Sequence, residues 1–167
     1  MALRHVADSY GVALSWETVV SGGEVNLQAL LVDFNGTIVD AVSYQRASSF
    51  GDAVIHAKDT ADGAKDGYNE LIWVKTQHLP AHVGLIMFVV GIHGALMKVV
   101  SGTITLFDMC GPVAKLPLQQ THGCVDCVAA MKRSGDVWNF HQMESLAELG
   151  HTFMDILEPT IGDVIRR

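Results

Sequence analysis

The residues of this sequence whose types and spacing could do chemistry lie in one polar segment, residues 56–70. It carries carboxylates at Asp59, Asp62, Asp66 and Glu70, with glycines between them. Calcium takes roughly six to eight oxygen ligands in a tolerant geometry, and glycine lets a chain turn so that its carbonyls point inward. We therefore expect a calcium site with Asp59, Asp66 and Glu70 as ligands. The alternative is a solvated turn, held by hydrogen bonds from its own aspartates.

The elements that must position this segment are strands. Asn35-Gly36 predicts a hairpin between residues 27–32 and 37–44, and a turn at 133–136 predicts a second one. We expect 11–16 and the proline-interrupted run 113–118 to be edge strands. A Gly-Ile-His-Gly turn is expected to join two buried strands within 83–107. The other expected strands are 53–55, 71–74, 123–131 and 137–141.

The C-terminal part differs, because 143–149 places apolar and acidic residues at helical spacing and 153–157 would add a further turn. About ten short strands separated by turn signals favour a mainly β fold, a two-sheet β-sandwich with a short C-terminal helix. We expect one domain spanning 1–167, since that length suits a single core.

The composition limits the classes of function. Hydrophobic residues make up 49% of the chain and charged residues 17%, and the formal net charge is -7. Acidic proteins bind nucleic acid or anionic membranes poorly, so neither is an expected partner. The apolar run 83–100 contains three glycines and Lys98, which argues against a transmembrane segment. No signal peptide is evident, and we expect a cytoplasmic protein.

Neither the cysteines nor any sequence motif indicates a catalytic or redox function. Cys110, Cys124 and Cys127 do not resemble a secreted disulfide framework. On a strand, Cys124 and Cys127 would face opposite sides, which argues against a shared metal or a redox pair. His78 and His82 are interpreted as an ordinary loop pair, because Pro80 stands between them. No nucleophile, phosphate-loop or zinc-protease motif is present.

An ordered set of short segments resembles the tellurium-resistance stress-protein family of the TerD type. The likeness extends over about residues 11–157 and includes Leu-Leu-Val-Asp-Phe-Asn-Gly at 30–36 and Leu-Ile-Trp-Val at 71–74. The other similar segments are 40–44, 48–49, 53–56, 59–70, 79–83, 88–90, 131–133, 138–140 and 153–157. The resemblance implies a non-enzymatic, calcium-binding β-sandwich that acts as an interaction module in stress and toxic-oxyanion resistance.

The resemblance also implies further ligands and shows substitutions among them. Glu24 and Asn26 stand where the family has Asp-Leu-Asp, and their spacing by two puts them on one face of a strand. Tyr68 and Asn69 stand where the family has acids before Glu70. The expected metal ligands are thus Glu24, Asn26, Asp59, Asp66, Asn69 and Glu70. Fewer carboxylates weaken calcium binding, so the cofactor is Ca²⁺ that is bound weakly or has been lost.

Three functions remain open. The first is a calcium-binding stress protein with protein partners. The second is a structural or assembly subunit, as a homo-oligomer or part of a larger complex, in which the metal site is degenerate. The third is an enzyme or thiol-redox protein using Cys124 and Cys127, which the opposite faces of these residues disfavour.

Overall fold

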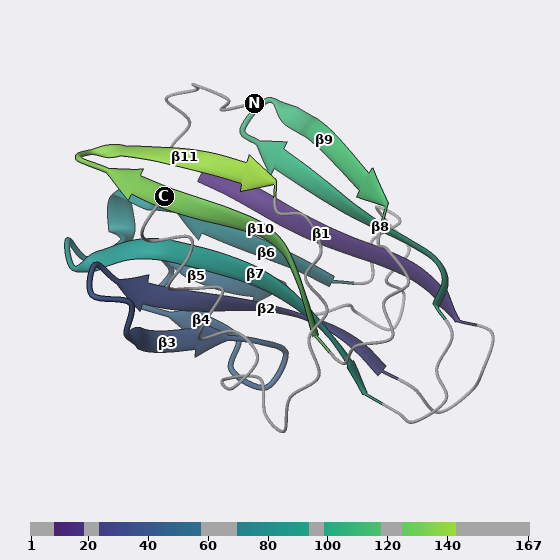
Figure 1. The fold of residues 1–167 in the computed structure, drawn as a ribbon. Helices are drawn as coiled ribbons and strands as arrows, with labels where there is room; N and C mark the ends of the chain where they lie inside the picture. The colour runs from purple at the N-terminus through teal and green to yellow at the C-terminus, as the bar shows by residue number, and fades with distance from the viewer. Residues whose placement is uncertain (1–8, 19–23, 58–69, 94–98, 118–124, 143–167) are drawn as a thin grey trace.

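The computed structural model describes residues 9–18, 24–57, 70–93, 99–117 and 125–142, and these form two antiparallel sheets (Figure 1). The six-stranded sheet has the order β4 (Ser48–Ser49), β5 (Val54–Ala57), β6 (Glu70–Lys75), β1 (Ser9–Thr18), β8 (Val99–Asp108) and β9 (Gly111–Pro117). The five-stranded sheet has the order β11 (Val137–Gln142), β10 (Val125–Ser134), β7 (Val83–His93), β2 (Glu24–Asp33) and β3 (Ile38–Val42). A 3₁₀ turn at Thr76–His78 precedes β7. A mainly β, two-sheet architecture is confirmed.

The core lies between the two sheets and follows from strand alternation. In β6, residues Glu70, Ile72 and Val74 are buried and alternate with half-buried neighbours, as expected for a strand with one face on a core. Phe140 of β11 stacks on Phe88 of β7 at 5.9 Å within the five-stranded sheet, and it joins the two sheets by meeting Tyr10 of β1 edge-on at 5.7 Å. Burial of these large rings is a major source of the stability of the sandwich.

The two ends of the sandwich differ in their connections. Hairpin turns join β2 to β3 and β10 to β11 on the left in Figure 1, and a further hairpin turn joins β8 to β9 near the top of the picture. At the Asn-Gly turn, Asp33 Oδ1 accepts hydrogen bonds from the N–H groups of Asn35 and Thr37, each at 2.9 Å. The strand termini that flank residues 58–69 lie at the opposite end. The predicted site therefore belongs to the end away from the short hairpins.

Two close approaches constrain the strands. A Cβ added at Gly11 of β1 would lie 3.0 Å from the ring of Trp73, and one added at Gly84 of β7 would lie 2.8 Å from the ring of Phe34. The rings differ in freedom: Trp73 is half-buried and tilted against Phe107 at 6.2 Å, whereas Phe34 is 56% exposed. Glycine is thus required more strictly at Gly11 than at Gly84.

The structure confirms both predicted hairpins and the edge position of β9, and it corrects two expectations. Residues 11–16 were expected at an edge, but β1 lies in the middle of its sheet between β6 and β8. The hairpin expected within 83–107 is wrong, because β7 and β8 belong to different sheets and residues 91–93 continue β7. The local alternation of apolar and polar residues indicates which side chains are buried, but it does not indicate which strand pairs with which. The predicted C-terminal helix falls outside the described residues.

Candidate functional site

Glu70, a predicted metal ligand, is the first residue of β6 and points into the sandwich. Strand alternation puts it on the same face as Ile72 and Val74, and it is only 7% exposed. Its Oε2 accepts a hydrogen bond from the backbone N–H of Leu27 at 2.5 Å, and its Oε1 lies 3.1 Å from Nε2 of His56. A buried carboxylate is costly unless its oxygens are paired, and here each oxygen has a partner.

The partner N–H is available because of how β2 is paired. Strand β3 pairs with Ala29–Val32 and ends there, so Leu27 lies beyond the end of β3. A backbone N–H at such a position needs another acceptor when it is buried. Glu70 supplies that acceptor from the opposite sheet. The carboxylate therefore ties the six-stranded sheet to the five-stranded sheet at this end.

His56 completes this group and was not predicted as a site residue. It lies in β5, opposite Ile72 of β6, and is 3% exposed. Its Nε2 carries the hydrogen that a carboxylate oxygen accepts, while its Nδ1 is buried without a partner among the described residues. The alternation Val54, Ile55, His56 already puts Val54 and His56 on one face. That alternation was the signal for His56, but the register with β6 was needed to pair it with Glu70.

Asn26 of β2, a predicted metal ligand, is buried, but it lies on the face of its strand that points away from Glu70. Leu27, Ala29 and Leu31 line the core, so Asn26 alternates to the outer face of the five-stranded sheet. Its Nδ2 has no hydrogen-bond partner among the described residues. Glu24 lies in the same strand, opposite His93 in the register with β7. The structure thus brings Glu70 to His56 and leaves Asn26 on a different surface.

The donors present fit calcium in chemical type. Calcium prefers carboxylate and amide oxygens, and each Glu70 oxygen keeps a lone pair after accepting one hydrogen bond. Among the described residues, no three His, Cys, Asp or Glu side chains lie together as a metal-holding group. Asp59, Asp66 and Asn69 fall outside the described residues. A complete site would thus need oxygens from residues 58–69.

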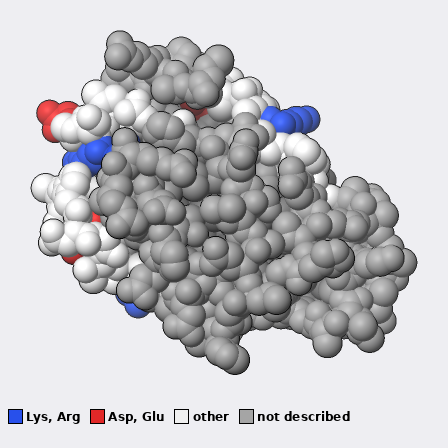
Figure 2. Space-filling model, in the orientation of Figure 1, with Lys and Arg blue, Asp and Glu red and all other residues white. Residues whose placement is uncertain are grey.

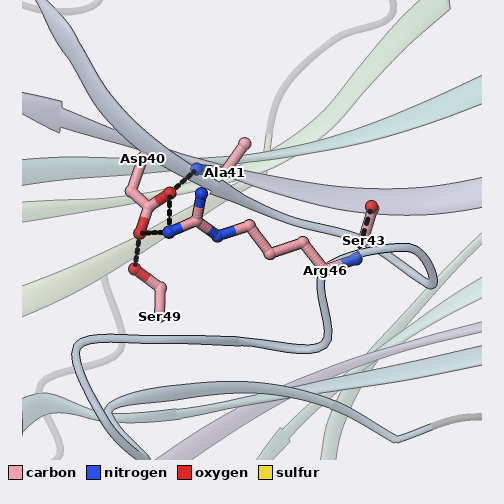
Figure 3. Close-up of polar contacts among 5 residues, drawn as sticks. All are labelled: Asp40, Ala41, Ser43, Arg46 and Ser49. Carbon is pink, nitrogen blue, oxygen red and sulfur yellow. Dashed lines mark hydrogen bonds and ion pairs between the residues drawn. The ribbon is translucent and has the colours of Figure 1, made fainter.

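A second polar group closes the side of the sandwich between β3 and β4 (Figure 3). The Asp40 carboxylate accepts a hydrogen bond from the Ser49 hydroxyl, and both of its oxygens lie 3.2 Å from Nη2 of Arg46. The N–H of Ala41 donates to the same carboxylate at 2.9 Å. Ser49 is 3% exposed, so its hydroxyl is shielded from any substrate. The group serves to join the edges of the two sheets.

A third group is on the surface. The Asp52 carboxylate lies 2.7 Å from Nζ of Lys75 and 2.7 Å from Nδ1 of His78. The hydrogen bonds from Lys75 and then from His78 lower the pKa of Asp52 to about 2. His82 instead meets the ring of Phe50 edge-on at 5.7 Å. His78 and His82 have different neighbours, as expected for a loop pair that does not share a ligand.

Figure 2 shows the charged side chains of the described residues on one face of the molecule. In Figure 2, the Lys, Arg, Asp and Glu side chains of the described residues are scattered among uncharged ones and form no extended basic area. Within the described ranges, no helix is long and apolar enough to cross a membrane. Cys110 is exposed and unpaired by disulfide, and Cys124 lies outside the described residues. The described surface therefore directs attention back to the end that carries Glu70.

Comparisons with known proteins agree with the resemblance. The family model described as the TerD domain matches residues 4–145. Tellurium resistance protein TerZ of Serratia marcescens is 26% identical over 148 residues, which cover 86% of this chain and 76% of TerZ. Tellurium resistance protein TerD of the same organism is 31% identical over 90 residues, which cover 50% of this chain and 47% of that protein.

Two crystal structures share the fold. The structure of SAV2460, a protein of unknown function, has a TM-score of 0.75 at 14% identity and covers 92% of this chain and 98% of its own. A homologue of telluride resistance protein TerD from Streptomyces coelicolor A3(2) has a TM-score of 0.72 at 14% identity, with coverage of 86% and 92%. At this identity the likeness supports the fold alone. Because the family model matches most of the sequence, this chain belongs to the TerD domain family.

Proposed function

We propose that this chain is a non-enzymatic protein of the toxic-oxyanion stress response that binds calcium and acts through protein partners in the cytoplasm. The family and the relatives named as tellurium resistance proteins support the process. The observation that carries the calcium assignment is the buried carboxylate of Glu70 at the strand end that leads from residues 58–69. A carboxylate is an unusual group to bury, and at this place it suits a cation site.

In this proposal, Asp59, Asp66, Asn69 and Glu70 supply oxygens from the acidic segment and the start of β6. Asn26, which was also expected as a ligand, is left out because it lies on the other face of β2. Bound calcium would neutralise the carboxylates and hold the segment to the sandwich. Because Tyr68 and the two asparagines replace acids of the family pattern, the affinity should fall at the weak end of calcium sites, with a Kd of roughly 10⁻⁴ M or weaker. The role of the metal is then to shape a binding surface, with no chemical step.

The test is isothermal titration of the full chain with calcium, with magnesium as the comparison ion. Wild-type protein should release or absorb heat with calcium, and Asp66→Ala should abolish the signal. Asp136→Ala is the matched control, because Asp136 is an exposed acid in the turn between β10 and β11 and its loss should change nothing. An absence of heat and of thermal shift at millimolar calcium would refute the calcium assignment.

A second function has its own support. Both Glu70 oxygens are already bonded to protein donors, which suits a member in which the site has become purely structural. Such a chain would serve as an assembly subunit. Light scattering coupled to size-exclusion chromatography separates the two proposals. A calcium-independent oligomer would favour the assembly subunit, and a monomer that binds calcium would exclude it.

A further inference from the structure

The two sheets have four edge strands among the described residues, and three of these edges are blocked. Strands β3 and β4 contact each other along one side of the sandwich, where the Asp40 carboxylate joins Ser49 and Arg46. Strand β9 carries two prolines, which lack the N–H that a ladder needs, and an exposed lysine. Natural sheets use such groups to keep an open row of N–H and C=O groups from pairing with another chain.

Strand β11, the fourth edge, has none of these protections. Among the described strands it ends the five-stranded sheet and pairs with β10 alone. Its sequence, Val-Trp-Asn-Phe-His-Gln, contains no proline and no Lys, Arg, Asp or Glu. Its register with β10 runs from 137 to 142 without a bulge. A strand of ordinary length is therefore left with a regular, uncharged edge.

The space beside β11 is bounded below by the other sheet. Phe140 of β11 meets Tyr10 of β1 at 5.7 Å, and beyond β1 the six-stranded sheet continues with β8 and β9. On β9, Val113 and Leu116 pack against the core and remain partly exposed. A strand added to β11 would widen its sheet by about 4.8 Å, and it would cover these side chains.

We propose that the free edge of β11 receives an extended segment of a partner protein as an added strand. This deepens the proposed role as an interaction module, on which it rests, and it requires no calcium. In strand addition, main-chain hydrogen bonds supply affinity and alternate side chains supply specificity. The segment is apolar at alternate positions, to cover Val113 and Leu116, and basic at its ends, because this chain has a net charge of -7.

A second copy of this chain fits the edge less well. Pairing β11 with its own copy needs a two-fold axis perpendicular to the joined sheet. That axis places both six-stranded sheets on the same side, and β9 projects beyond β11 in each copy. The two β9 strands would then occupy the same space, whereas a single added strand meets no such obstacle.

The probe is a fluorescent peptide, Lys-Thr-Val-Thr-Val-Thr-Val-Lys, titrated with the full chain and followed by anisotropy. Saturable binding is expected. Two matched peptides carry N-methyl groups on the valines or on the threonines, so that each set blocks one edge of the peptide strand. One set should weaken binding by at least about tenfold, since it removes main-chain hydrogen bonds, and the other should not. No saturable binding, or an equal effect of both sets, would overturn the proposal.

Two variants on β9 test the surface beneath the added strand. Leu116→Gln should weaken peptide binding by about fivefold or more, because less apolar area is covered. Lys115→Gln is the matched control, since its side chain is exposed and points to the other face, and it should not weaken binding. If Leu116→Gln melts far below the wild type, Val113→Thr replaces it. Unchanged affinity in the folded variant would overturn the proposal.

Amide hydrogen exchange locates the bound peptide. Saturating peptide should slow exchange in β11 by at least about tenfold and leave β3, the other edge of the same sheet, unchanged. Slowing confined to β3, or peptide affinity that falls as protein concentration rises, would overturn the proposal; the second result would make another copy the occupant. A peptide with glutamates in place of the lysines should bind more weakly at low salt, and equal binding would contradict a basic partner.

The titrations are performed in EDTA and repeated in millimolar calcium, and both should give the same affinity. A chain that binds the peptide without binding calcium would support the edge and refute the calcium assignment. A chain that binds calcium without binding the peptide would do the reverse.

Discussion

Removing the Glu70 carboxylate should loosen the two sheets at the end that carries the acidic segment. In Glu70→Ala, two buried donors lose their acceptor, the N–H of Leu27 and the Nε2–H of His56. Each unsatisfied buried donor costs about 1–3 kcal/mol. The expected loss in the free energy of unfolding is therefore about 2–6 kcal/mol, a range that includes the cost of breaking a buried charged pair.

The assay is urea unfolding followed by tryptophan fluorescence, performed in EDTA so that any loss of calcium binding does not contribute. In a thermal melt of a chain of this size, each kcal/mol lowers Tm by about 2–4 °C, which gives a shift of roughly 4–24 °C. Glu70→Gln is the matched variant, because the amide oxygen can still accept from Leu27 while the charge is gone. It should lose about 1–2 kcal/mol, the difference between charged and neutral hydrogen bonds.

Two results would refute this reasoning. One is a loss below about 1 kcal/mol in Glu70→Ala, which is the scale of an ordinary substitution without a buried partner. The other is full additivity in a double-mutant cycle with His56→Ala, since residues in direct contact should show a coupling of about 0.5 kcal/mol or more. Either result would show that Glu70 does not hold the two sheets together.

The remaining predictions concern other contacts. The pKa of Asp52 should be about 2, below its ordinary value of 3.8. The pairing of Asp52 therefore stabilises the folded state fully above pH 3.8, and this stabilisation is lost as pH falls through about 2. In Lys75→Ala, carbon NMR should find the pKa of Asp52 raised. Gly11→Ala should cost about 1–3 kcal/mol in urea unfolding because the half-buried indole must move, and Gly84→Ala, which meets an exposed phenyl ring, should cost clearly less; equal costs would contradict this. Arg133→Lys should lower the free energy of unfolding by about 1–2 kcal/mol, because the guanidinium donates to the carbonyls of Pro80 and Val83 at 2.9 and 3.2 Å and lies over the Trp138 ring at 5.4 Å. An unchanged urea midpoint would show that these contacts do not stabilise the fold.

By itself, the sequence determined which segments become strands and where the chain reverses. Alternation in 71–74 and the Asn-Gly at 35–36 are local signals, and local signals suffice for a strand or a hairpin turn. The family followed from the order of short segments along the chain, which needs no knowledge of contacts. The polar character of residues 56–70 and the importance of Glu70 were also evident from residue type.

Only the tertiary structure decided which strands became neighbours and where the polar side chains met. The partition of β7 and β8 into different sheets depends on burial shared by the whole molecule, which no local window contains. For the same reason, His56 emerged as the partner of Glu70, and Asn26 alternated to the outer face although it was predicted beside Glu70. A carboxylate that looked like a metal ligand was found joined to an N–H 43 residues away in sequence, because the early end of β3 left that group open.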